Sequence, residues 1–99
     1  MEHTGWLHCK VSKGILPDEF AIVVDTAEGK AVSFFMSGTN ITFSGGRPGK
    51  EDEKDATIPV QVIEQDEKYR LIVLPRETVD GARIAKVEAG MIEDRLVQR

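Results

Sequence analysis

Hydrophobic and polar residues alternate with a period of two along most of the chain, and turn residues interrupt the alternation about every ten positions. In residues 6–12, Leu7, Cys9 and Val11 should share the inner face of a first strand. Several such runs separated by turn signals are typical of an all-β, mainly antiparallel domain, here a small barrel or sandwich of six or seven strands. Barrel and sandwich give the same alternation, so the sequence leaves both open.

Residues 19–25 and 31–37 form the clearest predicted hairpin, and both of its faces carry apolar side chains. Gly29, in the connecting turn, can adopt the positive φ that closes a hairpin. One face holds Phe20, Ile22, Val24, Val32, Phe34 and Met36, and the second face holds Ala21, Val23, Ala31, Ser33 and Phe35. A hairpin with one side in solvent normally shows a polar face. We therefore expect another part of the chain, a partner subunit or a ligand to cover the second face.

Three further strands are predicted between residues 39 and 74. A short strand covers residues 39–43, and strands 57–63 and 69–74 form a second hairpin. Residues 44–56 contain three glycines, one proline and many charges, which indicates a mobile surface loop. Pro59 lacks an amide donor, so its strand should lie at a sheet edge or begin there.

The last quarter of the chain is compatible with two structures. Asp80-Gly81 is a hairpin-turn signal, which favours a seventh strand over residues 82–88. The apolar residues of this stretch also have helical spacing, but its glycines weaken a helix. Strand is therefore preferred there, and a short helix or a terminal strand is expected for residues 91–98. Whether residues 78–99 cover the second hairpin face stays open.

Length and composition indicate one globular domain. The 99 residues are 40% hydrophobic and 30% charged, with a net charge of −4, which argues against disorder. The single cysteine, Cys9, excludes an internal disulfide. The chain begins without the basic and apolar segments of a secretory signal, and its apolar runs, such as residues 21–24, are short. Because a membrane span needs about 20 apolar residues, we expect a cytoplasmic protein that does not enter a membrane.

The charge distribution disfavours nucleic acid as a partner. The 13 basic and 17 acidic residues form no basic tail, whereas binding to phosphates needs a clustered positive surface. An OB-like or SH3-like nucleic-acid binder remains as a third hypothesis. It requires Arg70, Arg76, Arg83 and Lys86 to share one face with exposed aromatic side chains.

No motif specifies a cofactor, a metal or a catalytic centre. In the glycine-rich loop, Ser44 and Glu51 stand where a phosphate-binding P-loop needs its first glycine and its hydroxyl residue. Two histidines and one cysteine are too few for a zinc site, and the adjacent His8 and Cys9 should point to opposite faces of one strand. We expect no cofactor and no metal, a buried Cys9, and a protein that is not an enzyme.

The leading hypothesis is a small non-catalytic interaction module that forms a homodimer or binds a protein partner through the second hairpin face. The expected interface residues are Trp6, Ala21, Val23, Ala31 and Phe35. The alternative is a small ligand-binding or carboxylate-using enzyme barrel. In that case Asp25, at the end of the second strand, would be half-buried and its pKa would be raised. A strand-end acid that faces water is the simpler interpretation of Asp25.

Overall fold

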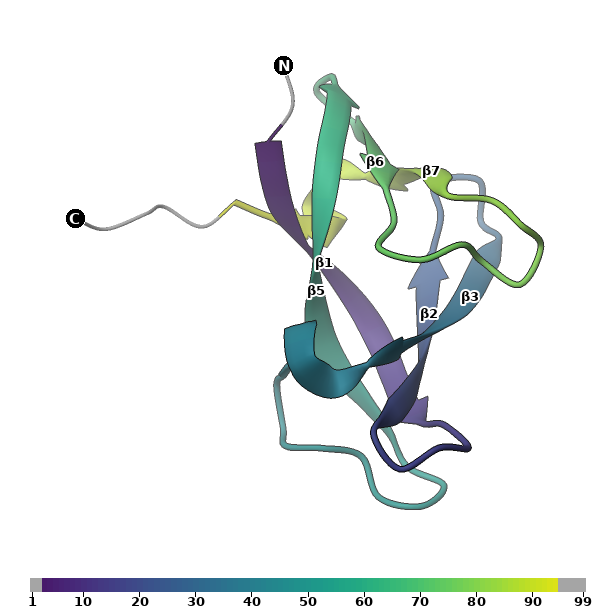
Figure 1. The fold of residues 1–99 in the computed structure, drawn as a ribbon. Coiled ribbons are helices and arrows are strands. Elements are labelled where there is room, and N and C mark those ends of the chain that lie inside the picture. The colour runs from purple at the N-terminus through teal and green to yellow at the C-terminus, as the bar shows by residue number, and fades with distance from the viewer. Residues whose placement is uncertain (1–2, 95–99) are drawn as a thin grey trace.

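The computed structural model describes residues 3–94, and over this range the chain forms one antiparallel sheet that curls into a half-barrel (Figure 1). The strands are β1 (His3–Lys13), β2 (Glu19–Asp25), β3 (Ala31–Ser37), β4 (Thr42–Phe43), β5 (Glu53–Gln65), β6 (Tyr69–Val73), β7 (Ile84–Glu88) and β8 (Ile92–Glu93). Two 3-10 turns, η1 (Gly38–Asn40) and η2 (Ala89–Met91), lie before β4 and β8. The predicted all-β fold is confirmed.

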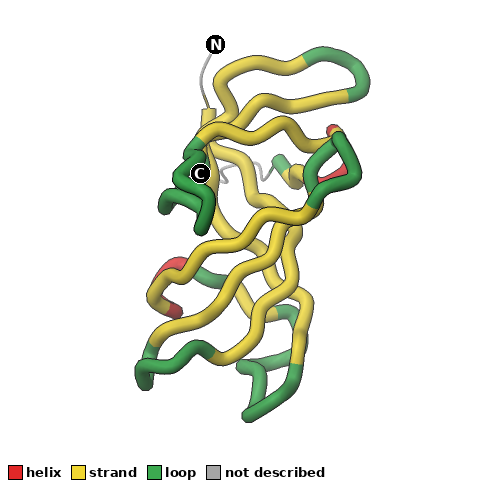
Figure 2. Tube along the Cα trace, turned by 90° about the vertical axis from the view of Figure 1, so that its right-hand side faces the viewer, coloured by secondary structure: helices red, strands yellow, loops and turns green. Residues whose placement is uncertain are grey.

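Two long strands, β1 and β5, lie at the centre of the sheet, whose order is β3-β2-β1-β5-β6-β7. Along β1, residues 6–7 pair with β8 and residues 10–13 pair with β2. Along β5, residues 56–57 pair with β4 and residues 61–65 pair with β6. Each central strand thus changes its outer neighbour partway along, and the sheet divides into two halves around one core (Figures 1 and 2).

The core is formed by the inward-facing positions of the alternating runs. Leu7, Cys9 and Val11 are buried, as their spacing predicts. From the β2–β3 hairpin, the buried residues are Phe20, Ile22, Val24, Phe34 and Met36. These side chains pack with residues of β5, β6 and β7 in one cluster. Burying one large apolar side chain stabilises the fold by about 1.5–3 kcal/mol, so this cluster supplies most of the driving force.

Two main-chain hydrogen bonds connect the two ends of the sheet order. The N–H of Ala27, in the β2–β3 turn, donates to the carbonyl of Lys86 in β7 at 2.8 Å. The N–H of Val79, in the loop between β6 and β7, donates to the carbonyl of Ser33 in β3, also at 2.8 Å. These bonds place the last strand beside the β2–β3 hairpin and partly close the half-barrel.

Strand β5 is longer than the sequence predicts. It begins at Glu53, because residues 53–57 pair with residues 8–12 of β1. The predicted loop 44–56 was therefore wrong over its last four positions. Their charges were interpreted as loop composition, but charged side chains are compatible with a strand whose outer face meets solvent.

Pro59 lies in the middle of the central strand β5, so the prediction that its strand is an edge or begins there was wrong. Pro59 is paired with Trp6 of β1. On the other side of β5, the pairing with β4 ends at Thr57 and the pairing with β6 begins at Gln61. Pro59 thus occupies a local gap in a central strand, where a missing amide donor is tolerated.

The C-terminal part is extended rather than helical. The strand predicted over residues 82–88 is confirmed for Ile84–Glu88, and η2 and β8 follow it. Gly81 has φ 87°, as its hairpin-turn signal requires. The predicted segment 91–98 is a 3-10 turn and a strand up to Glu93, and its residues 95–98 lie outside the described range.

No helix between residues 3 and 94 is long and apolar enough to span a membrane.

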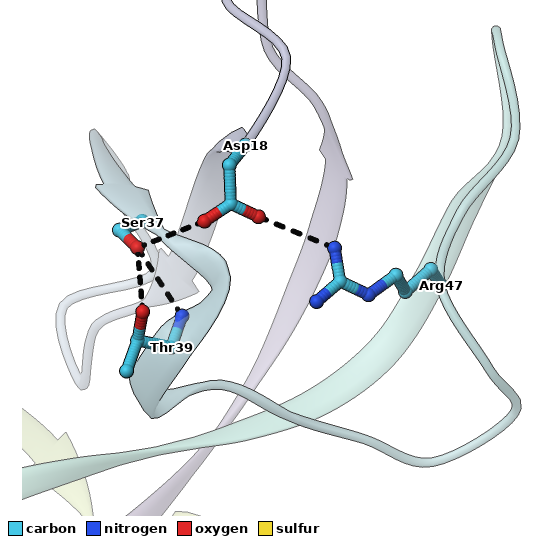
Figure 3. Close-up of polar contacts among 4 residues, drawn as sticks. All are labelled: Asp18, Ser37, Thr39 and Arg47. Carbon is cyan, nitrogen blue, oxygen red and sulfur yellow. Dashed lines mark hydrogen bonds and ion pairs between the residues drawn. The ribbon is translucent and has the colours of Figure 1, made fainter.

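The predicted strand 39–43 is shorter, because its first part is the turn η1. The hydroxyl of Ser37 caps this turn by accepting a hydrogen bond from the N–H of Thr39 at 3.2 Å. Figure 3 shows that Asp18 joins the same network, since its carboxylate accepts from Ser37 at 3.2 Å and from Arg47 at 3.3 Å. Arg47 therefore ties the glycine-rich loop to the turn between β1 and β2.

Arg47 also covers two aromatic rings at the edge of the core. Its guanidinium carbon lies 5.5 Å from the ring centroid of Phe20 and 5.4 Å from that of Phe43. We expect Arg47→Ala to lower the free energy of unfolding by about 1–2 kcal/mol, through loss of both cation–π contacts. The exposed bond to Asp18 should add little. Urea unfolding measures the effect. Lys50→Ala, in the same loop, is the control, and an equal effect of both variants contradicts the role given to Arg47.

Candidate functional site

The second face of the β2–β3 hairpin points away from the core and is continuous across both strands. Ala21 is paired with Phe35, Val23 with Ser33, and Asp25 with Ala31. The structure thus brings together four of the five predicted interface residues. Phe35 is the largest of them and 47% exposed, whereas its paired residue is an alanine. The aromatic ring therefore stands above a surface of small side chains.

A groove runs beside Phe35 at the end of the hairpin. It has a volume of about 360 Å³ and is lined by Leu16, Asp18, Glu19, Phe35, Met36, Ser37 and Arg76. Leu16 is 60% exposed, so two large exposed apolar side chains, Leu16 and Phe35, border the groove. Two acidic residues and one arginine lie at its rim. We call the second hairpin face together with this groove the Phe35 surface.

Trp6 does not belong to the Phe35 surface. It is half-buried and pairs with Pro59 and Glu93, in the N-terminal half of β1, which does not pair with β2. Six positions along β1 separate it from Ser12, which pairs with Ala21. At about 3.3 Å per residue, this separation is roughly 20 Å. Trp6 instead borders a different hollow, beside η1 and β4.

The described C-terminal residues do not cover the Phe35 surface. Val79 reaches β3, but it bonds to the main chain of Ser33 at the strand edge, and Phe35 remains exposed. Val79 is itself 72% exposed. Within residues 78–94, the chain thus closes the half-barrel and leaves Phe35 exposed.

A second site lies where β1 changes its neighbour from β8 to β2. It is a pocket of about 390 Å³, which we call the notch pocket. It is lined by His8, Cys9, Lys10, Val23, Asp25, Ser44, Asp55 and Met91. Asp25, the predicted acid, is one of its walls but is exposed rather than half-buried. Asp25 therefore shares a pocket with other polar groups. Its exposure agrees with the simpler interpretation of a strand-end acid that faces water, and the half-burial that the enzyme alternative requires is not found.

An ion pair crosses the notch pocket. The ammonium of Lys10 lies 2.5 Å from the carboxylate of Asp55, to which it is paired across β1 and β5. The hydrogen bond and the attraction between them raise the pKa of Lys10 and lower the pKa of Asp55. Both side chains are more than half exposed, so the pair adds little to stability. It fixes the position of one positive and one negative group at the pocket.

Cys9 is a buried structural residue. Its Sγ donates to the carbonyl of Ala56 at 3.6 Å, and burial, with a smaller contribution from Asp55, raises the pKa of the thiol to about 12. The thiolate needed for nucleophilic chemistry is therefore absent near neutral pH. His8 is exposed on the opposite face of β1, as the strand prediction requires. No group of three or more metal-binding side chains is present among residues 3–94.

The four basic residues of the nucleic-acid hypothesis do not form one surface. Arg70 pairs with buried Val87, and its guanidinium donates to the carbonyls of Asp66 and Tyr69. Lys86 is one position away in β7 and so faces the other side, where it lies 4.6 Å from the ring centroid of Tyr69. Arg70 and Lys86 therefore do not share one face with exposed aromatic side chains, as the hypothesis requires.

The sequence did not reveal that His8, Lys10 and Asp55 border a common pocket with Asp25. The available signal was the alternation in β1, which puts His8 and Lys10 on its outer face. The sequence pattern predicts a loop at Asp55, so it does not predict the pairing of Asp55 with Lys10.

The whole chain was compared with known proteins, and no family model, curated protein or solved structure matches it.

Proposed function

We propose that this protein is a small non-catalytic interaction module that forms a homodimer through the Phe35 surface. The observation that supports the proposal is the 47% exposure of Phe35 on a continuous face of small side chains. An aromatic side chain that projects from such a face is a typical anchor of a protein interface. Contiguous exposed apolar residues mark interaction sites more often than scattered ones do.

The shape and charge of this surface suit a second copy of the same chain. In a two-fold dimer each patch faces itself, so Phe35 of one copy would lie over the small side chains Ala21 and Ala31 of the other. The groove carries both Arg76 and the acidic Glu19. A two-fold arrangement can place the arginine of one copy near the carboxylate of the other. The two copies would then attract each other through opposite charges.

The expected dimer is weak and depends on concentration. A phenylalanine that buries about 200 Å² and is 47% exposed keeps roughly 90 Å² to bury, which is worth about 2 kcal/mol per copy. Association costs on the order of 4–15 kcal/mol in lost freedom. Phe35 therefore needs the surrounding contacts, including Leu16, to hold two copies together.

The test is light scattering on a sizing column, over an approximately hundredfold dilution series. We expect the mass of the wild type to fall from dimer towards monomer on dilution. Phe35→Asp should be monomeric at every concentration, because each interface would bury two unpaired charges. Its free energy of unfolding should change by less than about 1 kcal/mol, since Phe35 lies outside the core.

Ile84→Asp is the matched control. Ile84 is 54% exposed on β7, a similarly exposed apolar residue that is not part of the Phe35 surface, so this variant should dimerise like the wild type. A wild type that is monomeric at the highest concentration contradicts the proposal. So does a dimer that Phe35→Asp leaves intact.

A further inference from the structure

We propose that the notch pocket binds a small organic cation, an ammonium or guanidinium group carried on an apolar body. The pocket volume of about 390 Å³ lies within the range of small-molecule sites, which combine apolar walls with a few convergent polar groups. This inference concerns a different ligand from the proposed dimer, and its site shares Val23 and Asp25 with the second hairpin face.

The pocket follows from the strand pairing. The pairing of β1 with β8 ends at Leu7, and its pairing with β2 begins at Lys10. Residues 8–9 thus have no strand beside them on that side of β1. Asp25, at the end of β2, and Met91, in η2, border the opening. A site at a fixed gap in a hydrogen-bonded sheet needs little rearrangement to accept a ligand.

The charge of the pocket favours a cation. Lys10 supplies the ammonium group of the pocket, and its Nζ already lies 2.5 Å from Oδ1 of Asp55. Glu53 and Asp25 attract the same ammonium and contribute to the raised pKa of Lys10. The two carboxylates that line the pocket, Asp25 and Asp55, thus outnumber its one ammonium group, and among the described residues no ion pair engages Asp25. The excess negative charge attracts a second cation and opposes an anion.

The remaining walls favour an organic cation over a metal ion. The carboxylates do not converge, since residues 3–94 contain no group of three side chains placed to hold a metal. Val23 and Met91 offer apolar contact beside Asp25. Methionine adapts to ligands of varied shape. A cationic head at Asp25 with an apolar body against Val23 and Met91 satisfies both parts of the pocket.

The experiment compares two probes with the same apolar body and opposite charge, 2-phenylethylammonium and 3-phenylpropanoate, by amide NMR titration at constant ionic strength. We expect saturable shifts at His8, Lys10 and Met91 with the cation, and binding of the anion weaker by about tenfold or more. Asp25→Asn should weaken binding of the cation by about fivefold, through loss of a charge-assisted contact. Asp80→Asn, an exposed acid in the β6–β7 loop, is the control and should bind like the wild type.

Three outcomes would overturn the proposal: shifts that do not saturate, equal binding of the anion, or an Asp25→Asn variant that binds the cation as the wild type does. The titration is repeated with Phe35→Asp. Because every wall of the pocket comes from one copy of the chain, this monomeric variant should still bind the cation. Failure of the dimer proposal and failure of the pocket proposal are thereby distinguishable.

Discussion

The free energy of unfolding should fall steeply as the pH rises above 9, because the folded protein keeps Cys9 protonated. Burial raises the pKa of this thiol from 9.0 to about 12, whereas the unfolded chain exposes it. A pKa that is higher in the folded state gives a contribution to stability that is complete below the unfolded pKa and is lost as the pH approaches the folded pKa. The expected loss is about 1.4 kcal/mol per pH unit, or about 4 kcal/mol between pH 9 and pH 12.

Urea unfolding of the wild type and Cys9→Ala at pH 8, 9, 10 and 11 measures this contribution. Tyrosine and lysine residues also titrate in this range, but they are identical in the two proteins, so their effect cancels in the difference. We expect the wild type to lose stability relative to the variant as the pH rises. A difference between the two proteins that stays constant with pH would show that Cys9 is not protected by burial.

Gly5→Ala should destabilise the fold by about 1–3 kcal/mol, because no space exists for the added methyl group. A Cβ at this position would lie 2.7 Å from Cγ2 of Ile92 in β8 and 3.2 Å from Cγ2 of Val62 in β5. Gly5 lies on the inward side of β1, two residues before Leu7, where β8 joins the sheet. The methyl group must therefore displace β8 or move its isoleucine.

A double-mutant cycle with Ile92→Ala identifies the cause. In that background the methyl group of Gly5→Ala enters vacated space, so the substitution should be neutral or slightly stabilising, with a coupling of about 1–3 kcal/mol. Gly45→Ala is the control: nothing lies within 4 Å of its Cβ, and its φ is not positive. Additive effects of Gly5→Ala and Ile92→Ala would mean that β8 does not pack against Gly5 in solution.

Local patterns predicted the individual strands well and their pairing less completely. The alternation of residues 19–25 and 31–37 correctly predicted a hairpin with Phe34 inside and Phe35 outside, since a period of two decides the face of every residue in a strand. The glycine and charge content of residues 44–56 predicted a loop, and this prediction was wrong for residues 53–56. Residues 53–56 are a strand because β1 lies beside them, and no local signal reports a neighbour 45 positions away.

The same limit applies to the candidate sites. Ala21, Val23 and Phe35 could be assigned to one surface because they belong to one hairpin with a short turn. Trp6 was grouped with them on its outward orientation alone, and the distance along β1 separates it from them. For Asp25, the alternation predicted the end of a strand but not the pocket beside it. That pocket requires β2 and η2 to meet at the same point of β1.

Local sequence patterns are enough to predict an all-β chain, the inner and outer faces of β1, β2 and β3, and the exposed position of Phe35. These features depend on the side-chain period of a single strand and on turns of a few residues. The central position of β1 and β5, and the change of neighbour partway along each of them, are seen in the folded chain alone. Both the tolerated Pro59 and the notch pocket follow from those changes of neighbour. Long-range strand pairing depends on main-chain hydrogen bonds, which every residue except proline can donate, so the order of the sheet is decided by how the whole chain packs.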